Sequence, residues 1–165
     1  MTCPAYILMG VCGAGKSLIG PMLAARLGAA FEDADDHHLP RSRAKLAAGI
    51  PLTDEDRRPW YAVLRQRVVE TRAEGKKLVM ACSALHSGLR AWLRGDDDED
   101  LIRFILLECS RDTIAARMTA RAGHFMPASL LDSQIATLEI TPDLLRVPND
   151  REPQVVVQSI LQLIS

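Results

Sequence analysis

The residues from Gly10 to Ser17, GVCGAGKS, match the pattern G-x-x-x-x-G-K-[ST] of a loop that grips a polyphosphate. Glycines let the backbone amides turn toward an anion, and the positive end of a following helix adds to that attraction. In such a loop Lys16 would reach the β- and γ-phosphates, and the Ser17 hydroxyl would bind Mg²⁺. We predict that a nucleotide contacts the loop residues Gly10, Val11, Cys12, Gly13, Ala14, Gly15, Lys16 and Ser17.

The surroundings of this loop favour nucleotide binding over an ordinary glycine turn. Residues 5–9 are a short apolar run that predicts a strand, and residues 17–27 place apolar side chains on a helical period. A strand entering the loop and a helix leaving it are the context that the motif requires. Because this motif occurs in GTPases, motor ATPases and small-molecule kinases, other residues must decide the reaction.

Two acids after the second expected strand, at residues 30–32, point to a kinase of small alcohols. The sequence has neither an N-K-x-D element nor a D-x-x-G switch, which disfavours a GTPase, and no apolar strand ends in the Asp-Glu pair of ATP-driven machines. Asp35 could orient and deprotonate an acceptor hydroxyl, and Asp33 could hold a water molecule on Mg²⁺. The alternative is that these acids cap the next helix, a role for which Asp36 is the best candidate.

Two arginines on a later helix could act on the transferred phosphate. Arg117 and Arg121 lie four residues apart, on one face of a helix expected over residues 110–122. That helix leads into a segment we interpret as a lid, over about residues 121–138. Arginines that close over the phosphate would stabilise its charge and exclude water. The alternative is a solvated helix edge.

The remaining pattern predicts an α/β fold. Residues 78–82 and 102–107 are apolar without alternation, as in parallel strands covered on both faces, and residues 144–147 could form a fifth strand. Further helices are expected near residues 36–48, 53–75, 86–94, 127–138 and 155–164. The alternation predicts a doubly wound parallel sheet, which binds ligands beyond the carboxyl ends of its strands.

The helix expected after residue 53 has the clearest start signal. Thr53 can cap it, with the carboxylate of Asp56 three residues on. Its apolar period predicts a buried stripe made of Trp60, Val63, Leu64, Val68 and Val69.

Composition limits the class of protein further. The chain has 165 residues, 48% of them apolar, and a formal charge of -1, so one soluble globular domain over residues 1–165 is expected. With no global positive charge, binding to nucleic acid or to an anionic membrane is not expected. The four cysteines show no CxxC spacing, and we find neither a leader nor an apolar run near the ~18 residues of a membrane span. We therefore predict a reduced cytoplasmic protein.

The order of the motifs closely resembles that of the gluconate kinases, a group of shikimate-kinase-like P-loop kinases. The most specific matches are D-x-D-R-x-P-W at residues 54–60, C-S-A-L at 82–85 and G-H-F-M at 123–126. The resemblance implies a three-layer P-loop NTPase fold with a five-stranded parallel sheet in the order 2-3-1-4-5, a helical lid, and an acceptor-binding helical region at about residues 36–60. It also implies transfer of the ATP γ-phosphate to the 6-hydroxyl of D-gluconate, with Mg²⁺ as cofactor, by a homodimer.

A sugar acid needs a cation for its carboxylate and hydrogen-bond partners for its hydroxyls. The catalytic residues that we expect are Lys16, Asp35, Arg117 and Arg121, with Arg117 also contacting the nucleotide. The residues expected to bind the acceptor are Asp35, His38, Lys45, Arg57, Ser83, Arg90 and His124. For any of the acceptor residues, a plain surface role is the alternative.

Four positions depart from the usual pattern of the gluconate kinases. Leu39 and Ser42 stand where Pro and Asn are usual, His86 replaces a Lys, and Ile140 replaces a Pro. A neutral histidine is a weaker anion clamp than a lysine, so these departures bear on the preferred acceptor. Two alternatives remain: a kinase of another small hydroxy acid such as shikimate, and a nucleotide-binding regulator without catalysis.

Overall fold

The computed structural model describes residues 3–120 and 128–165. These residues form one parallel sheet of five strands in the order β2-β3-β1-β4-β5. The strands are β1 (Ala5–Met9), β2 (Ala30–Asp33), β3 (Leu78–Ala81), β4 (Ile102–Glu108) and β5 (Leu145–Pro148). The predicted strands and their order are confirmed.

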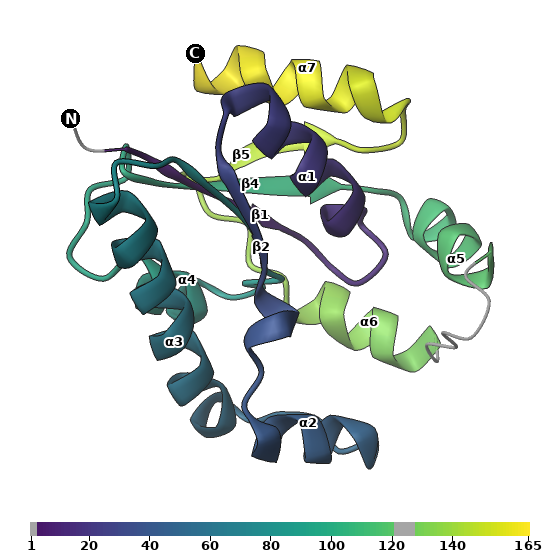
Figure 1. The fold of residues 1–165 in the computed structure, drawn as a ribbon. Coiled ribbons are helices and arrows are strands. Elements are labelled where there is room, and N and C mark those ends of the chain that lie inside the picture. Colours follow the sequence, from purple (N-terminus) through teal and green to yellow (C-terminus); the bar gives the residue numbers. More distant parts are fainter. Residues whose placement is uncertain (1–2, 121–127) are drawn as a thin grey trace.

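Helices cover both faces of the sheet, as Figure 1 shows. Helices α1 (Lys16–Leu27) and α7 (Pro153–Ile164) lie on one face, and α3 (Asp54–Ala73) and α4 (Ser87–Arg94) lie on the other. Alternate side chains of β1 enter different cores: Ile7 packs on the α3 and α4 side, and Leu8 on the α1 and α7 side. Because both faces of the sheet are covered at its centre, all five residues of β1 are apolar and buried.

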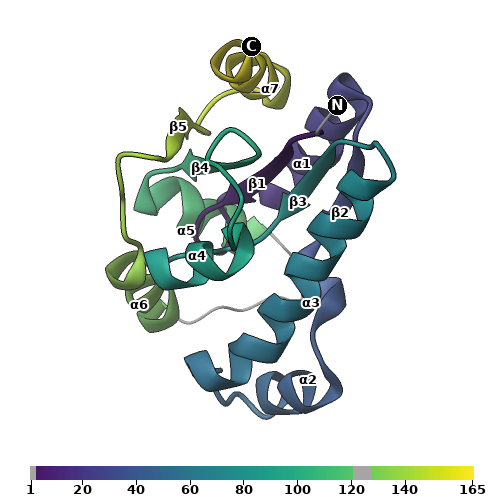
Figure 2. The same cartoon turned by 90° about the vertical axis from the view of Figure 1, so that its left-hand side faces the viewer.

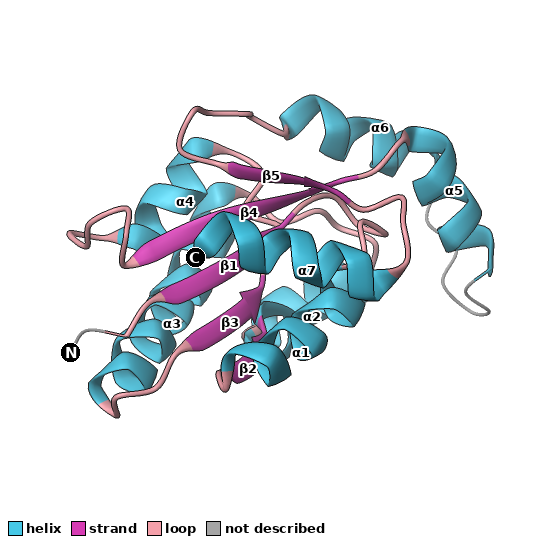
Figure 3. Ribbon diagram, turned by 90° about the horizontal axis from the view of Figure 1, so that it is seen from above, coloured by secondary structure: helices cyan, strands magenta, loops and turns pink. Residues whose placement is uncertain are grey.

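The central place of β1 sets the position of the phosphate loop. Strand β1 pairs with β3 on one side and with β4 on the other, so the loop after it leaves the middle of the carboxyl edge (Figure 3). Helices α5 (Arg111–Ala120) and α6 (Ala128–Thr137) follow β4. None of the helices within the described residues is both long and apolar enough to cross a membrane.

The polar helix expected near residues 36–48 is broken in two. A 3₁₀ helix, η1 (Ala34–His37), follows β2, and α2 (Pro40–Ala47) begins after an extended residue, Leu39. The break occurs here because the residue before a proline is disfavoured in the helical conformation. The expectation that Asp36 would be the cap is also wrong. Asp33 caps η1 by accepting a hydrogen bond from the Asp35 amide.

Helix α3 starts as predicted. The Thr53 hydroxyl accepts a hydrogen bond from the Asp56 amide at 3.2 Å, and the Asp56 carboxylate accepts one from the Thr53 amide at 3.1 Å. Trp60, Leu64 and Val68 are buried, but Val69 is 47% exposed, so the predicted stripe was wrong there. Consecutive helical residues point about 100° apart, which turns Val69 away from the sheet once Val68 faces it.

We expect Thr53→Ala to lower the free energy of unfolding by about 1 kcal/mol, because the hydroxyl that accepts a hydrogen bond from the Asp56 amide and donates one to the Asp56 carboxylate is lost. Urea denaturation followed by circular dichroism measures this. Thr119→Ala, in the exposed last turn of α5, is the matched control and should change stability by less than about 0.5 kcal/mol. Equal effects of the two substitutions would contradict a capping role for Thr53.

Candidate active site

The phosphate loop is held in a conformation that requires glycine. Gly10 and Gly15 have φ values of 144° and 97°, which other residues rarely adopt. Gly15 is also the N-cap of α1, and a Cβ atom on it would lie 2.5 Å from the Asn149 side-chain nitrogen. A side chain at this position would therefore strain the backbone and collide with Asn149.

The side chain of Lys16 folds back toward the start of the phosphate loop. Its ammonium group donates hydrogen bonds to the carbonyls of Gly10 at 2.8 Å and Val11 at 3.0 Å. Burial lowers the pKa of Lys16, while the nearby acids Asp33 and Asp35 act in the opposite direction. The lysine is thus a half-buried cation at the phosphate loop.

The Asp33 carboxylate joins the phosphate loop to η1. Its Oδ2 accepts a hydrogen bond from the Ser17 hydroxyl at 3.0 Å, and its Oδ1 accepts one from the Asp35 amide at 3.0 Å. Two adjacent oxygen donors, Ser17 and Asp33, suit Mg²⁺. Across residues 3–120 and 128–165, no group of three or more His, Cys, Asp or Glu side chains forms a metal cage. Mg²⁺ commonly takes one or two protein oxygens and completes its shell with phosphate and water, so the Ser17 and Asp33 oxygens fit this ion.

A second set of contacts supports the loop near Ala14. Asn149, which is buried, donates from its side chain to the Ala14 carbonyl at 2.5 Å. Arg117 in turn donates to the Asn149 carbonyl at 2.6 Å and to the Cys109 sulfur at 3.1 Å. The structure thus places Arg117 beside the loop. Asn149 was missed, although a lone asparagine after an apolar strand was a signal that could have found it.

Helix α6 also contacts the loop. The Gln134 side-chain oxygen accepts a hydrogen bond from the Cys12 amide at 2.7 Å. No role for Gln134 was predicted from the sequence. The predicted lid residues Arg121 and His124 lie outside the described residues.

Asp35 stands on η1, next to the Asp33 cap. Its carboxylate is 79% exposed and lies 3.5 Å from the Nε2 atom of His38. The His38 ring stacks on Trp60, with the ring centroids 3.9 Å apart. The structure thus brings together Asp35, His38 and Trp60 from two of the predicted motifs.

The cations at the start of α3 are paired with acids. The Lys45 ammonium contacts both carboxylate oxygens of Asp56 at 2.7 Å, which ties α2 to α3. Arg57 donates to Asp54 at 3.0 Å, and His86 lies 3.3 Å from the same carboxylate. Figure 2 shows α2 beside the start of α3.

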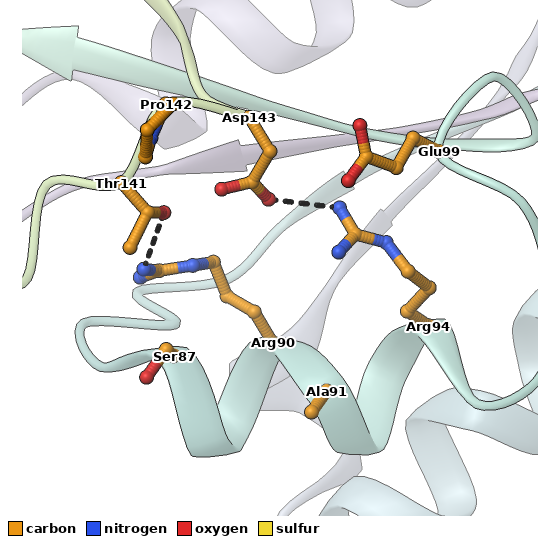
Figure 4. Close-up of a pocket in the computed structure, with 8 residues that line it drawn as sticks. All are labelled: Ser87, Arg90, Ala91, Arg94, Glu99, Thr141, Pro142 and Asp143. Carbon is orange, nitrogen blue, oxygen red and sulfur yellow. Dashed lines mark hydrogen bonds and ion pairs between the residues drawn. The ribbon is translucent and has the colours of Figure 1, made fainter.

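Arg90 is a buried support rather than an open cation. It is 2% exposed, and it donates to the carbonyls of Ala84 at 2.9 Å and Glu139 at 3.0 Å and to the Thr141 hydroxyl at 3.1 Å (Figure 4). Ala84 has a φ of 43°, an uncommon value for a residue with a side chain. Arg90 therefore stabilises the strained turn after Ser83, whose carbonyl accepts a hydrogen bond from the Gly10 amide at 3.3 Å.

A cavity of about 430 Å³ lies on the other side of Arg90, between α4 and residues 141–143 (Figure 4). An ion pair of 2.9 Å between Arg94 and Asp143 crosses it. The cavity contains no residue of the phosphate loop and neither Asp33 nor Asp35. It is therefore separate from the candidate active site.

The comparisons with known proteins agree with this geometry. Residues 12–163 match the family model described as shikimate kinase. The chain is 42% identical to the gluconokinase of Gluconobacter oxydans (strain 621H), over 94% of this chain and 88% of the relative. The structure also resembles the crystal structure of a gluconokinase from Sinorhizobium meliloti 1021, with a TM-score of 0.85. The two sequences are 35% identical, and the match covers 99% of this chain and 92% of the other.

A shikimate kinase from Acinetobacter baumannii is more distant. It is 18% identical, with a TM-score of 0.64, over 99% of this chain and 93% of the other, and the likeness extends to the fold alone. The fold and the phosphate loop thus define the class of protein, a small nucleotide-binding P-loop kinase that transfers phosphoryl groups. Within that class the chain belongs to the gluconokinase family, which confirms the resemblance read from its motifs.

The Lys45–Asp56 pair gives a testable pKa. Hydrogen bonds from Lys45, and then from Thr53, lower the pKa of Asp56 from 3.8 to about 2. Because the folded-state pKa is depressed, the pair stabilises the fold above pH 4, and this contribution is lost as the pH falls toward 2. We expect Lys45→Met to raise the pKa of Asp56 toward its ordinary value, as measured by NMR titration of the side-chain carboxyl.

The control for this titration is Lys76→Met, which removes an exposed partner of Glu74. It should leave the pKa of Asp56 near 2. An unchanged pKa of Asp56 in the Lys45 variant would contradict the assigned pairing.

Proposed function

We propose that the protein transfers the γ-phosphate of ATP to the 6-hydroxyl of D-gluconate, which yields 6-phospho-D-gluconate and ADP. The observation that carries this proposal is the Asp33 carboxylate, which links Ser17 of the phosphate loop to the turn bearing Asp35. This link sets a donor site and an acceptor-side acid next to each other. Relatives named gluconokinase indicate the acceptor.

Phosphoryl transfer depends chiefly on alignment and on neutralising charge. The loop amides and Lys16 would bind the β- and γ-phosphates, and Arg117 would contact the nucleotide from α5. Ser17 would bind Mg²⁺ directly, and Asp33 would hold it through a water molecule. The ion would draw charge from the phosphate oxygens.

Asp35 is the proposed general base. As the acceptor oxygen forms its bond to the γ-phosphorus and the bond to the ADP oxygen breaks, the hydroxyl proton passes to the Asp35 carboxylate. The carboxylate is well exposed, so an acceptor can reach it. Arg121, with Lys16 and Arg117, would stabilise the charge on the moving phosphoryl group.

The acceptor would bind among the ends of η1, α2, α3 and β3. Lys45 and Arg57 are the proposed cations for the sugar-acid carboxylate, and Ser83 and His124 the proposed partners for hydroxyls, with His38 beside Asp35 at the same edge. Arg90 would act indirectly, because its donors are engaged with Ala84, Glu139 and Thr141.

Of the four departures from the usual family pattern, His86 bears most directly on the acceptor. Ser42 is buried, Ile140 is 51% exposed, and Leu39 precedes α2. His86 contacts Asp54, the same carboxylate that pairs with Arg57. Its charge therefore bears on how strongly this end of α3 attracts an anion.

We also propose that the enzyme acts as a homodimer in the cytoplasm and binds neither nucleic acid nor membrane. A net charge of -1 supports the absence of a general attraction to polyanions. The homodimer rests on the family resemblance, and sedimentation at equilibrium would test it.

The acceptor is tested with a coupled assay of ADP release across gluconate, shikimate, related sugar acids and nucleoside monophosphates. We expect turnover with gluconate and Mg²⁺-ATP, at least about 100-fold above that with shikimate, since a site built for one set of hydroxyls rejects another. Turnover with shikimate and not with gluconate would favour the rival acceptor. ATP binding without turnover of any acceptor would favour a regulator.

The base is tested with Asp35→Asn. We expect turnover to fall about 100-fold or more, with ATP affinity nearly unchanged, because the amide cannot accept the proton. Initial-rate kinetics and nucleotide titration measure the two quantities. Asp36→Asn, at the next and also exposed position, is the control and should retain turnover; nearly full activity of the Asp35 variant would remove it from the mechanism.

A further inference from the structure

Trp60, the last residue of the D-x-D-R-x-P-W motif, holds the turn that carries Asp35. It is 4% exposed, and its indole nitrogen donates a hydrogen bond to the Ala34 carbonyl at 2.9 Å. Its ring stacks on that of His38 at 3.9 Å between centroids and 25° between planes. A residue from α3 thus fixes both the backbone of η1 and the histidine that follows it.

The stacked imidazole faces Asp35 with one nitrogen only. The His38 side chain is 10% exposed, and its Nε2 lies 3.5 Å from Asp35 Oδ1. Its Nδ1 is buried and has no hydrogen-bond partner among residues 3–120 and 128–165. A buried N–H without an acceptor is costly, so the proton belongs on Nε2, the nitrogen that lies 3.5 Å from the carboxylate.

The charge state of His38 agrees with that tautomer. Burial lowers its pKa most, with Arg43 and Arg57 acting in the same direction and Asp35 in the opposite one. The ring is therefore neutral at pH 7, and its single N–H is available at Nε2, the nitrogen next to the Asp35 carboxylate. A neutral donor leaves the Asp35 carboxylate able to accept a proton from the acceptor.

Other residues hold the backbone of the turn, but they do not contact the Asp35 carboxylate. Arg43 donates to the carbonyls of Asp36 at 2.7 Å and His38 at 3.0 Å, and Asp33 caps the start of η1. The carboxylate of Asp35 is 79% exposed, and its one polar side-chain contact within the described parts of the chain is His38. Orientation of that carboxylate therefore depends on the imidazole.

We propose that His38, stacked on Trp60, is a positioning residue that holds the Asp35 carboxylate in the orientation needed to accept the acceptor proton. This inference rests on the proposed function, in which Asp35 is the base. It assigns His38 an effect on turnover through Asp35, in place of the direct acceptor contact expected from its sequence position. The Trp60 ring supplies the flat, buried surface that keeps the imidazole in place.

Two substitutions separate the hydrogen-bond donor of His38 from its stacking surface. His38→Gln keeps an N–H near the position of Nε2, and His38→Phe keeps a flat ring on Trp60 but has no donor. We expect the Phe variant to lose about 10- to 100-fold in kcat, with KM for both substrates within about threefold, because a misplaced base slows the chemical step. The Gln variant should keep kcat within about fivefold.

Other roles for His38 predict other results. A rise in KM for the acceptor with kcat unchanged would mean that the ring binds the acceptor directly, and would overturn the proposal. Loss of kcat in the Gln variant equal to that in the Phe variant would mean that the stack matters and the donor does not. Urea unfolding of both variants shows whether either loss comes from the fold.

The decisive measurement is a double-mutant cycle with Asp35→Asn. If His38 acts through Asp35, His38→Phe should lower kcat by less than about threefold in the Asp35→Asn background. A full additional loss in that background would contradict the proposal. The cycle uses whichever acceptor the wild-type protein turns over best in the ADP-release assay. If that acceptor is not gluconate, the assignment of gluconate is rejected, but the test of His38 can still be carried out.

Discussion

The Asp33 carboxylate connects the two parts of the candidate active site, the phosphate loop and η1. One of its oxygens accepts a hydrogen bond from Ser17, at the start of α1, and the other accepts one from the amide of Asp35. Strands β1 and β2 are not neighbours, since β3 lies between them. A short side chain at the end of β2 therefore spans the gap between the phosphate loop and η1, which carries the proposed base.

The polar groups around this centre are satisfied by residues from several later elements. Asn149 holds the Ala14 carbonyl, Gln134 holds the Cys12 amide, and Arg90 supports the turn after β3. Buried polar groups need such partners, since an unpaired one is costly. The phosphate loop is thus held by α6 and by the segment after β5 as well as by its own glycines.

The cations on the acceptor side are arranged differently. Lys45 and Arg57 each contact an acid of the capping segment, Asp56 or Asp54. These ion pairs organise the start of α3 and its link to α2. The pairs therefore hold both cations, the proposed partners of the sugar-acid carboxylate, in fixed positions.

The sequence by itself determined the strands, the phosphate loop and the capped start of α3, because each depends on residues that are close together in the chain. The tertiary structure decided which polar residues meet. The bonds from Asn149 to Ala14 and from Cys12 to Gln134 join residues 135 and 122 positions apart, a distance over which no local pattern acts. It also decided that Arg90 is buried and that Val69 is exposed, since burial depends on the neighbours that the fold supplies.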